Sequence, residues 1–140
     1  MSRRLLVSFR ADGTPRPQGS KKAFVVKGRA VMVDDNKPQL KEWRNAVKAA
    51  AAAALVAHGI EPKAEGALAV ALEFTFERPK SVKRAMPHVA PDLDKLQRSV
   101  LDALTTAGVW KDDAQVTTIS ARKIYGPNPG ALVSVYREKE

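Results

Sequence analysis

Alternating apolar and polar residues predict the longest strand of the chain. Between residues 67 and 77 every second position is a large apolar residue, with alanine, glutamate and threonine between them. Successive side chains of a strand point to opposite faces, so this segment is expected to bury one face. Short apolar runs bounded by turn residues predict the other strands. These are Leu5–Arg10, the hairpin pair Ala23–Val26 and Ala30–Val33, then Val116–Tyr125 and Leu132–Tyr136.

Apolar residues at steps of three and four predict two amphipathic helices. The first covers residues 40–54 and follows a segment, residues 34–36, whose side chains offer N-cap oxygens. The second covers Leu93–Leu104, with Asp92 near its start and Gly108 at its end. Each helix is therefore expected to bury one stripe of its surface.

The predicted elements follow the order β-ββ-α-β-α-ββ. This order predicts an α/β fold of the α+β kind, in which a mixed β-sheet packs against two main helices. A length of 140 residues suits one domain over residues 1–140, and we find neither an internal repeat nor a long linker.

Composition narrows the class of protein. The chain has no cysteine, which excludes disulfides and thiolate metal sites and favours a reducing compartment such as the cytoplasm. Its longest apolar stretch, residues 49–57, is too short to span a membrane. The 24 Lys and Arg residues against 15 Asp and Glu residues give a net charge of +9. A partner with dense negative charge is expected, and nucleic acid is the first candidate.

Basic residues are concentrated in two loops and on one helix. The loops, residues 13–22 and 78–91, contain glycine or proline and lack an apolar period. We expect their cations to contact DNA phosphates, with ordinary solvated charge as the alternative. These candidates are Arg16, Lys21, Lys22, Lys80, Lys83 and Arg84. The first helix carries Lys41, Arg44 and Lys48 along one side, which we interpret as a solvated face.

Two acidic pairs bracket the second helix of this basic chain: Asp92 with Asp94, and Asp112 with Asp113. If the strand after Asp113 packs alongside the start of the helix, the carboxylates meet, and their repulsion either raises their pKa values or requires a cation, of which the cation is the simpler expectation. Oxygen ligands without histidine or cysteine favour Mg²⁺, with Mn²⁺ as a substitute, and such sites act on phosphate esters. The alternative is structural, because aspartate also caps helices and forms turns.

The segment over residues 91–116 carries a longer and more specific pattern. Its elements, in order, are Asp92, Asp94, Asp102-Ala-Leu104, Gly108-Val109, Asp112-Asp113 and Gln115-Val116. This pattern resembles the signature of the RusA family of Holliday junction resolvases. The proline-containing basic segment over residues 13–22 is also similar to that family's N-terminal loop, so the resemblance covers essentially the whole chain.

The resemblance implies a homodimeric, Mg²⁺-dependent endonuclease that cuts four-way DNA junctions by paired symmetric nicks in recombination and repair, typically in phage or prophage. It implies that Asp92, Asp94 and Asp113 are the catalytic carboxylates that hold the metal, with Asp112 an adjacent candidate and Asp102 a structural residue. A two-fold dimer also suits a junction that needs two equivalent cuts.

Two residues depart from the family pattern. Lys95 stands where the family has asparagine, and Arg98 stands where it has a functional lysine. Arg98 can clamp a phosphate and stabilise transition-state charge, but it does not exchange a proton near neutral pH. Lys95 is a candidate to supply the ammonium group and to contact DNA. Three interpretations stay open. The protein is a junction resolvase, a catalytically inactive junction-binding protein of the same fold, or a nuclease with a broader substrate preference for branched or single-stranded DNA.

Overall fold

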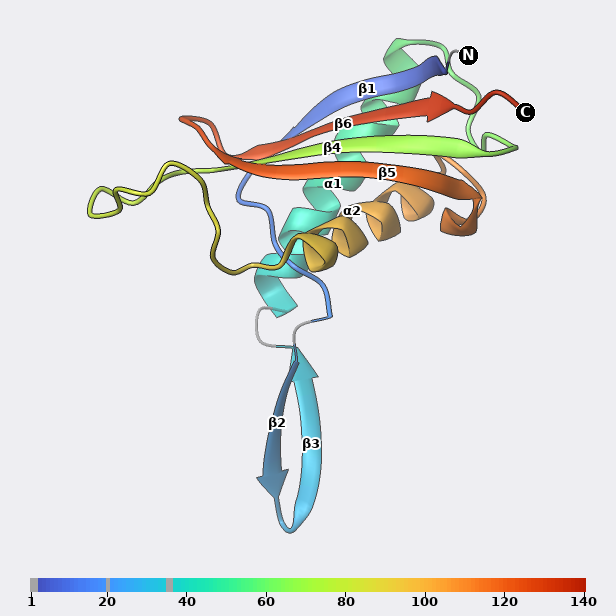
Figure 1. The fold of residues 1–140 in the computed structure, drawn as a ribbon. Helices are drawn as coiled ribbons and strands as arrows, with labels where there is room; N and C mark the ends of the chain where they lie inside the picture. The colour runs from blue at the N-terminus through green and yellow to red at the C-terminus, as the bar shows by residue number, and fades with distance from the viewer. Residues whose placement is uncertain (1–2, 20, 35–36) are drawn as a thin grey trace.

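The elements follow the predicted order (Figure 1). The computed structural model describes residues 3–19, 21–34 and 37–140, and it describes residues 21–24, 26, 31–34 and 37 through their backbone alone. The elements are β1 (Arg4–Asp12), β2 (Lys21–Val26), β3 (Arg29–Asp34), α1 (Lys37–Ala57), β4 (Leu68–Phe76), α2 (Leu93–Ala107), the short 3₁₀ helix η1 (Asp113–Gln115), β5 (Val116–Tyr125) and β6 (Gly130–Arg137). The predicted N-cap residues Asp35 and Asn36 lie outside the described residues.

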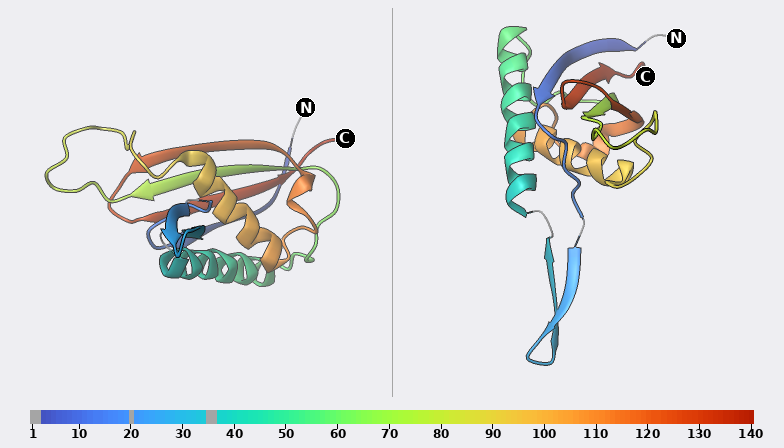
Figure 2. Two further views of the ribbon diagram at one scale, coloured as in Figure 1. Left: turned by 90° about the horizontal axis from the view of Figure 1, so that it is seen from below. Right: turned by 90° about the vertical axis from the view of Figure 1, so that its left-hand side faces the viewer.

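Four strands form a mixed sheet in the order β1-β6-β4-β5, which confirms the predicted α+β fold. β6 runs antiparallel to both β1 and β4, whereas β4 and β5 are parallel. Parallel neighbours need a long crossover connection, and here the basic loop over residues 77–92 together with α2 provides it. Both α1 and α2 lie on the same face of the sheet (Figure 2).

The core lies between the helices and the central strands. On β4 the predicted apolar face is buried, and Leu68 and Phe74 are completely inaccessible. Trp43 on α1 and Leu96 on α2 pack into the same cluster. Ala69 and Thr75, on the other face of β4, are buried as well. The interior position of β4 between β5 and β6 explains this, because neighbouring side chains shield a central strand on both faces.

The ends of α2 are defined by different means. Asp92 occupies the N-cap position with an extended backbone, yet its side chain makes no capping hydrogen bond. At the other end Gly108 adopts φ 81° and donates its amide hydrogen toward the carbonyls of Leu104 and Thr105. That left-handed conformation suits glycine, so the predicted end of the helix is confirmed.

β2 and β3 form a separate hairpin that projects from the rest of the domain (Figure 1). Its turn residues, Lys27 and Gly28, both have positive φ, at 51° and 77°. Positive φ at both turn positions is the geometry that matches the twist of two short strands. Among the described residues, no helix is long and apolar enough to cross a membrane.

Candidate active site

The acidic residues of the sequence pattern form two groups at opposite ends of α2. Asp92 and Asp94 stand at its start, while Asp112 and Asp113 follow its end. At about 1.5 Å per residue, the 15 residues of α2 span roughly 22 Å. Among the residues that the structure describes, no three histidine, cysteine, aspartate or glutamate side chains come together to hold a metal ion. One copy of the chain therefore holds these carboxylates in two separate groups, which we call half-sites.

The condition for convergence within one chain is not met. The strand after Asp113, β5, does run toward the start of α2, since the Lys123 ammonium donates to the carbonyls of Val89 and Pro91 at 2.7 and 2.8 Å. Asp113, however, lies in η1, which precedes the beginning of β5 and not its end. The far end of the strand, rather than the aspartate, lies beside Asp92.

The half-site at the start of α2 is open to solvent. Asp92 and Asp94 are exposed, and neither side chain is used in a cap. The ammonium of Lys95 lies 3.7 Å from a carboxylate oxygen of Asp92. The structural alternative for Asp92, a helix cap, is therefore not realised. Lys95, one of the two departures from the family pattern, supplies a cation directly beside this carboxylate.

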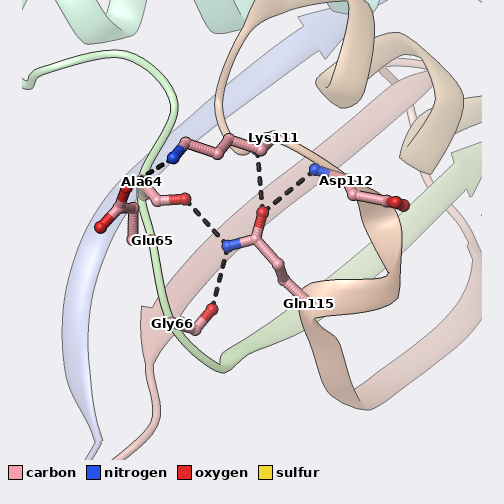
Figure 3. A network of polar contacts seen from close by, with 6 residues as sticks. All are labelled: Ala64, Glu65, Gly66, Lys111, Asp112 and Gln115. Carbon is pink, nitrogen blue, oxygen red and sulfur yellow. Dashed lines mark hydrogen bonds and ion pairs between the residues drawn. The ribbon is translucent and has the colours of Figure 1, made fainter.

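The half-site after α2 is built around the side-chain amide of Gln115 (Figure 3). Its oxygen accepts the backbone N–H groups of Lys111 and Asp112 at 2.9 and 3.0 Å. Its nitrogen donates to the carbonyls of Ala64 and Gly66 at 2.9 and 3.0 Å. Gln115 thus ties η1 to the loop that precedes β4. The sequence marked Gln115 only as part of the pattern, and its role as an anchor comes from the structure.

Asp112 and Asp113 have different roles within this half-site. The Asp112 carboxylate accepts the N–H of Ala114 at 2.9 Å and completes a capping box with Gln115, so the structural alternative holds for Asp112. Asp113 is free of such a role. Partial desolvation, a hydrogen bond shared with Asp112 and the charges of Asp112 and Asp102 raise the pKa of Asp113. Crowded carboxylates of this kind favour a proton or a cation.

The first basic loop lies along the exposed side of α2. The N–H of Gln18 donates to the Lys95 carbonyl at 3.0 Å, and its side-chain amide donates to the carboxylate of Asp102. The buried hydroxyl of Ser99 donates to the carbonyl of Arg16 at 2.8 Å. These contacts fix the loop against the helix that carries the acidic residues. Nothing in the sequence singled out Gln18 or Ser99, because their partners lie about 80 residues away.

The first basic loop also passes close to Arg98 of α2. A Cβ at Gly19, which has φ 97°, would lie 3.0 Å from the Arg98 guanidinium, so the loop backbone runs directly over this side chain. Arg98 is exposed and Arg16 is half-buried. Lys21 and Lys22 follow in β2, and their side chains lie outside the described residues.

The three residues of the second basic loop that were predicted to contact phosphates lie in two different environments. Lys80 and Lys83 are exposed on the loop. Arg84 is half-buried: its Nε donates to the Tyr125 hydroxyl at 2.9 Å, and its guanidinium carbon lies 5.9 Å from the centre of the Tyr125 ring. Arg84 therefore anchors the loop to β5, which leaves the two lysines at its surface.

These features define a basic α+β fold with carboxylates at both ends of α2 and a basic loop packed along that helix, a class that suits an enzyme of phosphate esters. The family model of endodeoxyribonuclease RusA matches residues 12–136. The chain therefore belongs to the RusA endodeoxyribonuclease family, as the sequence pattern predicted. No curated protein matches the chain. The matched residues include both half-sites and both basic loops, and membership implies an endonuclease that resolves Holliday junctions.

Proposed function

We propose that the protein is a Mg²⁺-dependent endonuclease, with Mn²⁺ as a substitute, that resolves four-way DNA junctions by paired symmetric nicks. It acts as a homodimer in recombination or repair, and its cysteine-free composition fits the cytoplasm. Family membership supports nuclease activity on branched DNA. The donor chemistry supports the metal, because carboxylates without histidine or cysteine favour Mg²⁺ or Mn²⁺.

The observation that carries the dimer is the separation of the two half-sites by α2. At neither end of the helix do three candidate ligands of a single copy come together among its described residues. If two copies pair about a two-fold axis with their α2 helices antiparallel, the Asp92–Asp94 end of one copy lies beside Asp113 of the other. Such an isologous interface creates two equivalent complete sites. Two equivalent sites suit two symmetric nicks.

Each side chain then has a defined part in hydrolysis. A bound Mg²⁺ ion would lower the pKa of the attacking water and neutralise charge on the phosphate. Asp92, Asp94 and Asp113 would hold that ion, with Asp112 beside them. The guanidinium of Arg98 would bind a phosphate oxygen and stabilise developing charge without transferring a proton.

Surrounding cations hold the flanking DNA. Lys95 keeps an ammonium group beside Asp92, which places a positive charge at the half-site where the family has asparagine. Arg16, Lys21 and Lys22 in the first loop, with Lys80 and Lys83 in the second, contact the phosphates on either side of the cut. Arg84 contributes by anchoring the second loop.

Subunit mixing tests the shared site directly. Asp94→Asn and Asp113→Asn should each abolish Mg²⁺-dependent cleavage of a labelled four-way junction. A one-to-one mixture, refolded together, yields heterodimers in which one site carries both defects and the other carries none. Nicking should therefore return at about a quarter of the wild-type site number, as single nicks rather than paired ones. If each site were built within one chain, every site in the mixture would carry a defect and no activity would return.

The same assay separates the remaining interpretations. Wild-type protein that binds the junction but does not cut it in Mg²⁺ or Mn²⁺ would be an inactive binding protein. Equal cleavage of junctions, forks and single strands would indicate a nuclease of broader preference. EDTA should abolish cleavage by the wild type, and a variant such as Lys139→Gln, at an exposed position far along the chain from both half-sites, should cut normally.

A further inference from the structure

A groove of about 350 Å³ runs between α1 and α2, outside both half-sites. α1 contributes the three cations of its basic stripe together with Asn45, and α2 contributes Ala103 and Thr106. The sequence predicted a solvated face for that stripe, and Lys41 and Lys48 are indeed exposed. Because α2 packs beside α1, this face also forms one wall of a groove.

The three cations of the groove are available to a ligand. Lys41 and Lys48 are exposed and Arg44 is partly exposed. Among the side chains that the structure describes, none of the three has an ion-pair partner. Three like charges within one groove repel one another, so an anionic ligand would relieve that repulsion.

The length of the row fits a nucleic-acid backbone. Lys41 and Lys48 are seven residues apart on one helix, which is about 10.5 Å at roughly 1.5 Å per residue. Successive phosphates of a DNA strand rise by roughly 3.4 Å along the duplex axis but are farther apart along the backbone, so a row of this length suits about two or three of them. Asn45 adds a neutral hydrogen-bond donor, and Ala103 lines the groove with a small side chain.

The groove also lies near the C-terminal end of α2, which Asp112 and Asp113 follow. The hydroxyl of Thr106 donates to the Asp102 carbonyl at 3.0 Å, which places the groove one helical turn beyond Asp102. The charge of Asp102 in turn contributes to the raised pKa of Asp113. A strand held in the groove would therefore lie close to the half-site that contains Asp113.

We propose that this groove binds the phosphate backbone of one junction arm next to the cleavage site. Lys41, Arg44 and Lys48 neutralise consecutive phosphates, and the groove fixes the arm relative to α2. This assignment rests on the proposed nuclease function for its substrate class. It adds a DNA contact that lies on neither of the two basic loops.

The test compares two variants that lose the same charge. Lys41→Gln, Arg44→Gln and Lys48→Gln are combined in one protein, because glutamine keeps good helix propensity. Arg4→Gln, Lys63→Gln and Lys139→Gln form the control, since all three side chains are exposed and lie outside the groove. Junction affinity is measured with EDTA present, so that no cleavage occurs, across salt concentrations of about 50 to 200 mM.

The groove variant should bind the junction at least about tenfold more weakly, and its slope of log affinity against log salt should fall by about two to three. The control should lose much less affinity and keep its slope. Equal affinity and equal slope in the two variants would overturn the assignment. If the triple variant does not fold, Lys48→Glu alone should still weaken binding and lower the slope.

Failure of the groove and failure of the nuclease proposal are separable. A wild-type protein that cuts junctions, together with a groove variant that binds as tightly as the control, would refute the groove alone. A wild-type protein that binds but never cuts, together with a groove variant that has lost affinity, would refute the nuclease and leave the groove in place.

Discussion

Replacing Gln115 by alanine removes four hydrogen bonds at once. The side-chain amide joins Lys111 and Asp112, before η1, to the carbonyls of Ala64 and Gly66. All four donor–acceptor distances lie between 2.9 and 3.0 Å. Each such bond contributes about 0.5 to 1 kcal/mol net at a partly exposed site, so Gln115→Ala should lower the free energy of unfolding by about 2 to 4 kcal/mol. Urea unfolding followed by circular dichroism measures this change.

Gln115→Ala should also lower the rate of cleavage, by more than its loss of stability explains. Gln115 acts as a positioning residue, because it holds the turn that carries Asp113 without reaching the DNA in our proposal. At a temperature well below unfolding, Gln115→Ala should lower the single-turnover cleavage rate by about tenfold or more, since small displacements of catalytic groups are costly. Junction affinity measured in EDTA should change little.

Gln115→Glu gives a sharper test of the same geometry. Glutamate keeps an oxygen for the two N–H groups but turns a second oxygen, in place of a donor, toward the Ala64 and Gly66 carbonyls. Its pKa should therefore rise in the fold, and the variant should regain stability as the pH falls and the carboxyl becomes a donor. Gln39→Ala, at an exposed position on α1, is the control. A Gln115→Ala effect as small as that of the control, or no recovery of Gln115→Glu in acid, would refute this account.

Three further outcomes are expected. Ser99→Ala leaves the Arg16 carbonyl without its buried donor and should cost about 1 to 2 kcal/mol in urea unfolding, against near neutrality for the exposed Ser120→Ala. The raised pKa of Asp113 means that its ionised form is disfavoured in the fold, so Asp113→Asn should raise Tm slightly at neutral pH in EDTA. This gain in Tm should vanish as the pH falls and the wild-type carboxyl is protonated. A gain that persists in acid would contradict this prediction. Arg98→Ala should slow cleavage at least about tenfold while Arg98→Lys retains most of it; equal rates for alanine and wild type would remove Arg98 from the mechanism.

The sequence predicted the elements because side-chain alternation reports burial directly. It placed the last strand from Leu132, whereas β6 begins at Gly130. Gly130 pairs with Asp12, and a Cβ there would lie 2.5 Å from the Ala11 carbonyl oxygen, so the close approach of two backbones requires glycine. Backbone pairing of this kind leaves no apolar signal in the chain. The same reason explains why β1 extends to Asp12, beyond the predicted Arg10.

The sequence predicted only part of the candidate site. The positions of the aspartates relative to α2 followed from the helical period and Gly108. Their distribution into two half-sites required the direction of β5, which depends on sheet pairing and not on local pattern. The contacts of Gln18 and Ser99 join the first loop to α2, and such distant pairs are invisible in a single sequence. The conversion of the Lys41–Lys48 stripe into a groove likewise depended on how α2 packs against α1.

The position of β6 in the sheet has a consequence for how the chain folds. β6 is synthesised after the other three strands of its sheet, yet it lies between β1 and β4 and is hydrogen-bonded to both. Its pairing with β1 joins Arg4 to Arg137, across almost the full length of the chain. During synthesis, therefore, β1 has no partner strand in the sheet until β6 has left the ribosome. Folding should be dominated by late, non-local strand pairing and should be slow compared with helical proteins of similar size.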